Sequence, residues 1–97
     1  MRIIAKRALR AFWEKHPNAE APLLAWYRTV KHEDWNTSAK VKARFPKASI
    51  IGDSRVVFNI RGNHYRLVAK IDYRHRIVFV RFVGTHADYD HIDAREV

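Results

Sequence analysis

The residues best suited to chemistry stand together in the stretch GTHADYD at 84–90. His86, Tyr89 and Asp90 have i, i+3 and i+4 spacing, so one helical turn would place them on the same side. A histidine titrates near neutral pH and is a natural proton carrier, while a tyrosine can orient a hydroxyl, stack on a base or carry a proton. The stretch directly follows an apolar, strand-like run that carries Arg81.

These side chains are the parts that cleavage of RNA without a metal ion requires. A base takes the proton of the ribose 2′-hydroxyl, cations stabilise the charge on the pentacoordinate phosphate, and an acid protonates the departing 5′ oxygen. His86 is the expected proton carrier, and Arg66 and Arg81 are the expected cations. Spacing alone does not separate a nuclease from a non-catalytic RNA-binding module, so both interpretations stand at this point.

A metal or cofactor site is disfavoured. His86 and Asp90 are i, i+4 partners and Asp88 is close, but the chain has no H-E-x-x-H motif, and a basic surround repels divalent cations. Three glycines cannot build a phosphate-binding glycine-rich loop, and the absence of cysteine removes thiolate sites and disulfides. We therefore predict no metal and no cofactor.

The charge of the chain favours a polyanionic partner. Its 97 residues carry a formal net charge of +9, from 19 Lys+Arg against 10 Asp+Glu. Between residues 55 and 81 the cations outnumber a single acid, Asp72, whereas the last residues are mostly acidic. The cations of that segment are Arg55, Arg61, Arg66, Lys70, Arg74, Arg76 and Arg81. This distribution indicates a basic binding surface with a polar rim.

The elements that position these groups follow from the hydrophobic pattern. In the first half, a short strand at 2–4 precedes three helices whose apolar residues recur at helical spacing. The tryptophans and tyrosines of these helices fall on the same period and are expected in the core. The residues expected to cap or end the helices are His16-Pro17, Asn18, Asn36 or Thr37, and Pro46.

The second half alternates as strands do. Two runs at 55–60 and 64–73 flank Gly62-Asn63, which predicts a hairpin, and a turn at 74–76 leads into a last strand at 77–84. Alternation divides the last strand into two faces. One face is expected to hold Val78, Val80 and Phe82, and the other Phe79, Arg81 and Val83.

The predicted architecture is one α+β domain spanning 1–97, with helices packed on one face of a small antiparallel sheet and a short C-terminal helix. The face without helices is expected to be uncovered and shared by Asn59, Arg66, Lys70 and Arg81. No run of the sequence has the length and apolar character of a signal peptide or membrane span, so we expect a cytoplasmic protein without a membrane partner.

Three stretches resemble the HigB family of type II toxins, within the broad RelE/ParE superfamily. They are MRIIAKRAL at the start, FNIRGNHYRLV at 58–68 and VRFVGTHADYD at 80–90, and the resemblance extends over nearly the whole chain. It implies a RelE-like domain and a ribosome-associated endoribonuclease, an mRNA interferase that cleaves translated messages and arrests growth. It also implies a cognate helix-turn-helix antitoxin, through which the toxin would meet DNA only indirectly.

The resemblance also implies site residues. Asn59 and Arg66 match polar positions of the hairpin, Arg81 matches the basic position of the last strand, and the terminal motif is matched by Thr85, His86, Tyr89 and Asp90. With the pattern above, this predicts a catalytic set of His86, Tyr89, Arg66, Arg81 and Asp90. The predicted RNA-binding set is Asn59, Arg61, Lys70, Arg55 and Thr85. A ParE-type toxin that targets gyrase is the remaining alternative, and the His-x-x-Tyr-Asp cluster argues against it.

Overall fold

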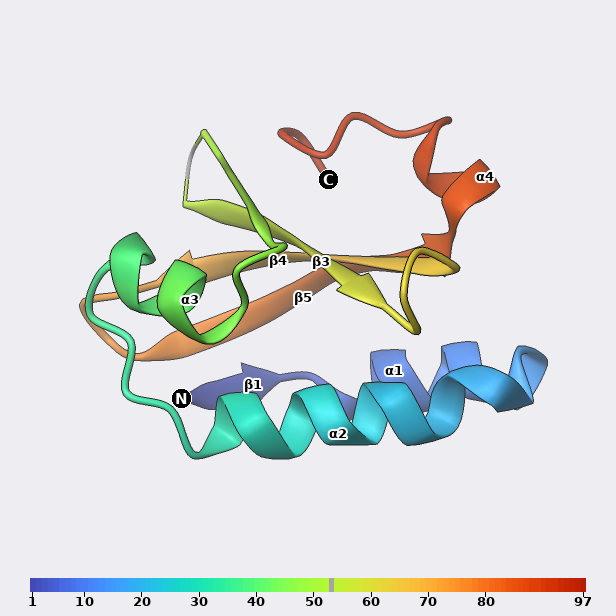
Figure 1. Ribbon diagram of the computed structural model, residues 1–97, viewed down its shortest axis with the longest axis horizontal. Coiled ribbons are helices and arrows are strands. Elements are labelled where there is room, and N and C mark those ends of the chain that lie inside the picture. Colours follow the sequence, from blue (N-terminus) through green and yellow to red (C-terminus); the bar gives the residue numbers. More distant parts are fainter. Residues whose placement is uncertain (53) are drawn as a thin grey trace.

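A five-stranded sheet forms the centre of the molecule, with strand order β1-β5-β4-β3-β2 (Figure 1). The structure is a computed structural model that describes residues 1–52 and 54–97. The strands are β1 (Arg2–Ile4), β2 (Ser49–Ile51), β3 (Arg55–Ile60), β4 (Tyr65–Asp72) and β5 (Ile77–Thr85). The α+β class is confirmed.

The sheet is mixed, so the prediction of a purely antiparallel sheet is wrong at one edge. β2, β3, β4 and β5 pair antiparallel in sequence order, whereas β1 lies parallel to β5. β1 and β5 are separated by most of the chain, and parallel strands need such a long connection. Local alternation carries no information about this pairing.

The helices are α1 (Lys6–Lys15), the 3-10 turn η1 (Pro17–Ala19), α2 (Glu20–Lys31), α3 (Ser38–Arg44) and α4 (His86–Tyr89). α1 and α2 lie antiparallel on one face of the sheet, and α4 lies on the opposite side (Figure 1). Phe58 of β3 is 1% exposed and meets Trp26 edge-on with ring centroids 5.4 Å apart. The aromatic residues of the first half therefore build the core, as predicted. None of the helices within residues 1–52 and 54–97 is long and apolar enough to cross a membrane.

One predicted helix cap is wrong, and another residue stands at the predicted cap position without a capping hydrogen bond. Asn18 does not cap α2, because Pro17 opens a 3-10 turn that takes in Asn18, and Ala19 becomes the N-cap residue. The Asn18 amide oxygen instead accepts a hydrogen bond from the Tyr65 hydroxyl. Thr37 stands at the N-cap of α3, but its side chain makes no capping hydrogen bond.

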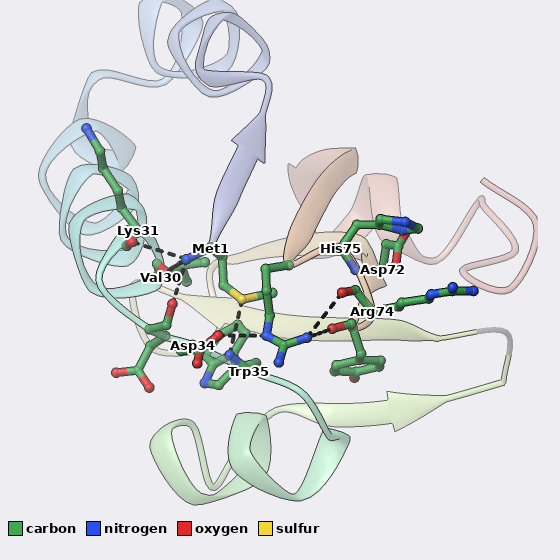
Figure 2. Close-up of polar contacts among 11 residues, drawn as sticks. Met1, Val30, Lys31, Asp34, Trp35, Asp72, Arg74 and His75 are labelled. Carbon is green, nitrogen blue, oxygen red and sulfur yellow. Dashed lines mark hydrogen bonds and ion pairs between the residues drawn. The ribbon is translucent and has the colours of Figure 1, made fainter.

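The start of β1 is fastened to the end of α2. The Met1 amino group donates to the carbonyl oxygens of Lys31 at 3.2 Å and Glu33 at 2.6 Å, and the Met1 sulfur accepts from the main-chain N–H of Trp35 at 3.2 Å (Figure 2). Carbonyl groups at a helix C-terminus lack partners within the helix. The amino group therefore satisfies them while it holds β1 in place beside β5.

A β-bulge in β5 overturns part of the predicted face assignment. Val68 pairs with Phe82 and the next residue of β4, Ala69, pairs with Val80, so Arg81 is left as the extra residue of the bulge. Beyond the bulge the alternation is reversed. Phe82 consequently lies on the face away from α1 and α2, and Val83 packs against the core.

The face of the sheet away from α1 and α2 is covered in its middle. Residues 91–97, which we name the C-terminal segment, turn back across this face (Figure 1). Val57 and Val68 are 5% and 0% exposed, yet neither belongs to the core between sheet and helices. The predicted open face is therefore wrong in its central part, because a thin third layer lies on it.

Candidate functional site

The end of β5 leads without a loop into α4. The Thr85 hydroxyl accepts a hydrogen bond from the Asp88 N–H at 3.0 Å, and the Asp88 carboxylate accepts one from the Thr85 N–H at 3.2 Å. This reciprocal pair is a capping box that begins α4. The His86 N–H donates to the His64 carbonyl at 3.2 Å, which joins the start of α4 to the β3–β4 turn.

α4 presents its chemical groups as the spacing predicts. The His86 Nδ1 atom lies 3.5 Å from a carboxylate oxygen of Asp90, and both side chains are about half exposed or more. Tyr89 is half-buried, with its ring centroid 6.4 Å from that of Phe82. The imidazole is therefore open to a ligand, while the phenol ring is held against the sheet.

Arg66 is fixed next to this turn by two amides. Its Nη1 donates to the Asn59 Oδ1 at 2.6 Å and to the Asn63 Oδ1, and its guanidinium lies 5.7 Å from the centroid of the Tyr89 ring. Within the described residues, no carboxylate oxygen lies within 4.0 Å of this guanidinium. Amide oxygens orient the cation without cancelling its charge, which leaves it suited to a phosphate.

We name Asn59, Asn63, Arg66, His86 and Tyr89 the α4 cluster. Asn63 was interpreted from the sequence only as a turn residue. The Asn63 amide reaches Arg66 because of the conformation of the β3–β4 turn, in which Arg61 and Gly62 have positive φ angles of 52° and 62°. The Gly62-Asn63 pair signals the turn, but no feature of the sequence shows that the Asn63 amide reaches back to Arg66.

Four of the predicted cations lie away from Arg66, and three of these form a group farther along the sheet. Arg66 pairs with Gly84, so Arg81, three residues earlier in β5, is about 10 Å along the strand from that point. Arg55 pairs with Lys70 across β3 and β4. We name Arg55, Lys70 and Arg81 the distal cations, since the C-terminal segment separates them from the α4 cluster.

Arg61 belongs to neither group. It lies in the β3–β4 turn and, with Trp26 and Thr29 of α2, lines a hollow of about 230 Å³. This places Arg61 beside the helical layer rather than beside Arg66. β3 ends at Ile60, so the alternation of strand residues does not extend to Arg61.

Two ionisable groups near the distal cations have shifted pKa values. The main-chain N–H of His75 donates to Asp72 at 3.0 Å and the ring Nδ1 lies 2.9 Å from the same carboxylate, which holds the pKa of Asp72 below its ordinary value (Figure 2). Burial raises the pKa of the Tyr73 hydroxyl. The Asp72 carboxylate is thus ionised and already engaged by His75.

The donor set of the α4 cluster suits proton transfer and phosphate binding. It combines an imidazole, a phenol, a guanidinium and two amides on a rigid strand end. Over residues 1–52 and 54–97, no three His, Cys, Asp or Glu side chains are grouped so that they could share a metal ion.

Fold and site together define a small basic α+β domain with groups suited to proton transfer and phosphate binding at one end of its sheet. The chain belongs to the HigB toxin family, described as the RelE-like toxic component of a toxin–antitoxin system, which matches residues 19–92.

Named relatives match over almost the full chain. The mRNA interferase toxin HigB of Escherichia coli strain K12 is 31% identical over 96 residues, which are 97% of this chain and 92% of the relative. The mRNA interferase HigB of Escherichia coli O6:H1 is 29% identical over 92 residues, or 93% of this chain and 89% of the relative. The mRNA interferase HigB of Shigella flexneri is 31% identical over 96 residues.

Proposed function

We propose that this protein is the toxin of a toxin–antitoxin pair and an endoribonuclease that cleaves translated mRNA without a metal ion. Membership of the HigB toxin family and relatives named mRNA interferases support the class of activity. The observation that carries the chemistry is Arg66, held by two amides beside Tyr89 and left without a described carboxylate partner.

The proposed reaction is attack of the ribose 2′-hydroxyl on the adjacent phosphate. The bond from the 2′ oxygen to phosphorus forms and the bond from phosphorus to the 5′ oxygen breaks, which yields a 2′,3′-cyclic phosphate and a 5′-hydroxyl. One of His86 and Tyr89 takes the 2′-hydroxyl proton and the other supplies a proton to the leaving oxygen. Arg66 stabilises the added negative charge of the pentacoordinate phosphate.

The remaining predicted residues take supporting roles in this proposal. Asp90, 3.5 Å from the His86 ring, orients the imidazole. Thr85 sets the start of α4 through the capping box. Asn59 positions Arg66 and presents an amide to the RNA beside it.

We also propose the finer partners that the family suggests. The toxin acts on messages at the ribosome, a helix-turn-helix antitoxin neutralises it, and both proteins work in the cytoplasm. The net charge of +9 supports a surface that approaches RNA. DNA is met only through the antitoxin.

Primer extension on cellular transcripts after induced expression tests this function. Wild-type protein and the control His91→Ala, which changes an exposed histidine next to the cluster, are expected to produce new 5′ ends within coding sequences. His86→Ala is expected to produce none while it remains folded. Inhibited DNA supercoiling without new RNA ends would instead indicate a gyrase-targeting toxin, and RNA binding without new ends would indicate a non-catalytic module.

A further inference from the structure

We propose that the distal cations form a second phosphate-binding subsite for the RNA, and that the C-terminal segment fills this subsite in the free protein and leaves it when RNA binds. The identity of the ligand as RNA rests on the proposed function. The subsite and its occupant rest on the contacts of Arg55, Arg81 and Val97.

Two guanidinium groups converge on one oxygen. The main-chain oxygen of Val97 accepts hydrogen bonds from Arg55 Nε at 3.2 Å, Arg55 Nη2 at 2.9 Å and Arg81 Nε at 3.2 Å. Guanidinium groups repel each other at short range unless an acceptor lies between them. A phosphate oxygen suits this position, because arginine offers a fork of donors that matches phosphate geometry.

The neighbourhood of this oxygen is built for an anion. Arg55 is 8% exposed, which is rare for an arginine, and its cross-strand partner Lys70 adds a third cation. Lys70 and Arg81 also line a hollow of about 500 Å³ together with Ser54 and Phe79. The acid at its rim, Asp72, is engaged by His75, as described above.

The subsite lies in line with the α4 cluster. Arg66 and Lys70 are on β4, and Gly84 and Arg81 run beside them on β5. A single strand with one phosphate at Arg66 therefore has its next phosphates directed along the sheet toward Arg81. In the free protein that path is crossed by the C-terminal segment, with its acidic residues Asp93 and Glu96.

The C-terminal segment is attached in a way that allows it to leave. Apart from the three hydrogen bonds that Arg55 and Arg81 donate to the Val97 oxygen, its described hydrogen bonds beyond α4 are short-range, as in Glu96 N–H to the Asp93 carbonyl at 3.0 Å and Val97 N–H to the same carbonyl at 3.1 Å. Ile92, Ala94 and Val97 are only partly buried, and Ile92 lines a hollow of about 380 Å³ with Ile51 and Tyr89. Segments with few buried contacts open locally at low free-energy cost.

Hydrogen exchange of the full chain tests the proposal directly. The probe is a 2′-O-methyl RNA oligonucleotide, which binds as a single strand but cannot be cleaved by 2′-hydroxyl attack. Binding is expected to speed exchange of the Glu96 and Val97 amides while it slows exchange in β4. Unchanged or slower exchange at Glu96 and Val97 in the complex would overturn the proposal.

Variants give a second, independent readout. Arg81→Gln is expected to weaken oligonucleotide binding and to lower the slope of log affinity against log salt by about one. Ile92→Ala, which loosens the segment, is expected to strengthen binding several-fold. Lys40→Gln, an exposed cation on α3 away from both groups, is the matched control with smaller effects on both quantities. If a folded Ile92→Ala protein bound the oligonucleotide more weakly, the C-terminal segment and RNA would not compete for the subsite.

Cleavage of an unmodified RNA of the same sequence separates this inference from the proposed function. Release of the segment by the oligonucleotide without new 5′ ends in the transcripts of expressing cells would support the subsite and contradict the nuclease. Cleavage by the wild-type protein without release of the segment would support the nuclease and contradict the subsite.

Discussion

At the scale of single residues, Gly84 illustrates how closely α4 approaches the sheet. A Cβ atom at position 84 would overlap the Phe82 ring and meet the Asp88 Cβ at 3.0 Å. The φ angle of Gly84 is not in the left-handed region, so the constraint is steric. The ring that would be displaced is the one that supports Tyr89.

We therefore expect Gly84→Ala to lower the free energy of unfolding by about 1–3 kcal/mol and to reduce RNA cleavage as well. Denaturant unfolding and a cleavage assay measure the two effects. Gly52→Ala is the control for stability, because an added Cβ at position 52 meets nothing within 4 Å. A Gly84→Ala protein with wild-type stability and activity would show that α4 is not packed in this way.

Single residues also show what the sequence could predict about the site. His86 and Asp90 lie together because helical spacing is a local property, and Thr85 caps their turn for the same reason. Arg66 and Arg81 were expected on one uncovered face, but the hairpin register pairs Arg66 with Gly84, three residues beyond Arg81, and Arg81 is the extra residue of the β5 bulge. Alternation within single strands does not fix this register, so the separation of the two cations could not be predicted.

At the scale of elements, α4 depends on its cap more than longer helices do, since it has only four residues. Thr85→Ala removes the hydroxyl acceptor of the capping box at a cost of about 0.5–2 kcal/mol. We expect cleavage to fall more than global stability does, because α4 carries His86 and Tyr89 whereas the core does not involve it. Hydrogen exchange at α4 and a cleavage assay report the two effects.

Thr37→Ala provides a matched control for that change. Thr37 occupies the N-cap position of α3, but its side chain makes no capping hydrogen bond. The substitution is expected to leave both stability and cleavage close to wild type. Equal losses in the Thr85→Ala and Thr37→Ala proteins would mean that the capping box does not position the site.

The β4–β5 turn provides a pH-dependent contribution to stability. Hydrogen bonds from His75 hold the pKa of Asp72 below its ordinary value of 3.8. A carboxylate with a lowered pKa in the folded state stabilises the protein above its unfolded pKa, and the contribution is lost as the pH falls through the folded pKa. The turn is therefore expected to be strongest at neutral pH and weakened in acid.

Asp72→Asn is accordingly expected to lower the Tm at neutral pH, with a difference from wild type that shrinks as the pH falls below about 3.8. Thermal unfolding of both proteins at several pH values measures this. Glu14→Gln, on the exposed side of α1, controls for the loss of one negative charge. If the Tm difference between the two proteins grew in acid, the pKa of Asp72 would not be lowered in the folded state.

The elements differ in how far the sequence determined them. β3 was predicted with its observed bounds, since its alternation and the Gly62-Asn63 turn are local signals. The parallel pairing of β1 with β5 and the return of the C-terminal segment were not predicted, because both join parts of the chain that are distant in sequence. Val57 and Val68 were the available hint, as apolar residues on a face that was expected to be uncovered.

At the scale of the whole molecule, the chain forms three layers: the helices, the sheet and the C-terminal segment. α1 and α2 bury the core on one side of the sheet, and the sheet end holds the α4 cluster rigidly on the other (Figure 1). Arg66 belongs to the α4 cluster, whereas Arg55 and Arg81 donate hydrogen bonds to Val97 at the end of the C-terminal segment. Arg66, Lys70 and Arg81 therefore lie along two neighbouring strands of the sheet.

The most direct test of RNA cleavage by 2′-hydroxyl attack replaces one oxygen of the substrate. An RNA that wild-type protein cleaves is synthesised with a single 2′-deoxynucleotide on the 5′ side of the cleaved bond, and both substrates are incubated with the protein in the presence of a metal chelator. The proposed function predicts cleavage of the all-ribose RNA to a 2′,3′-cyclic phosphate and no cleavage at the substituted position. Cleavage at the 2′-deoxynucleotide, or dependence of cleavage on a divalent cation, would contradict it.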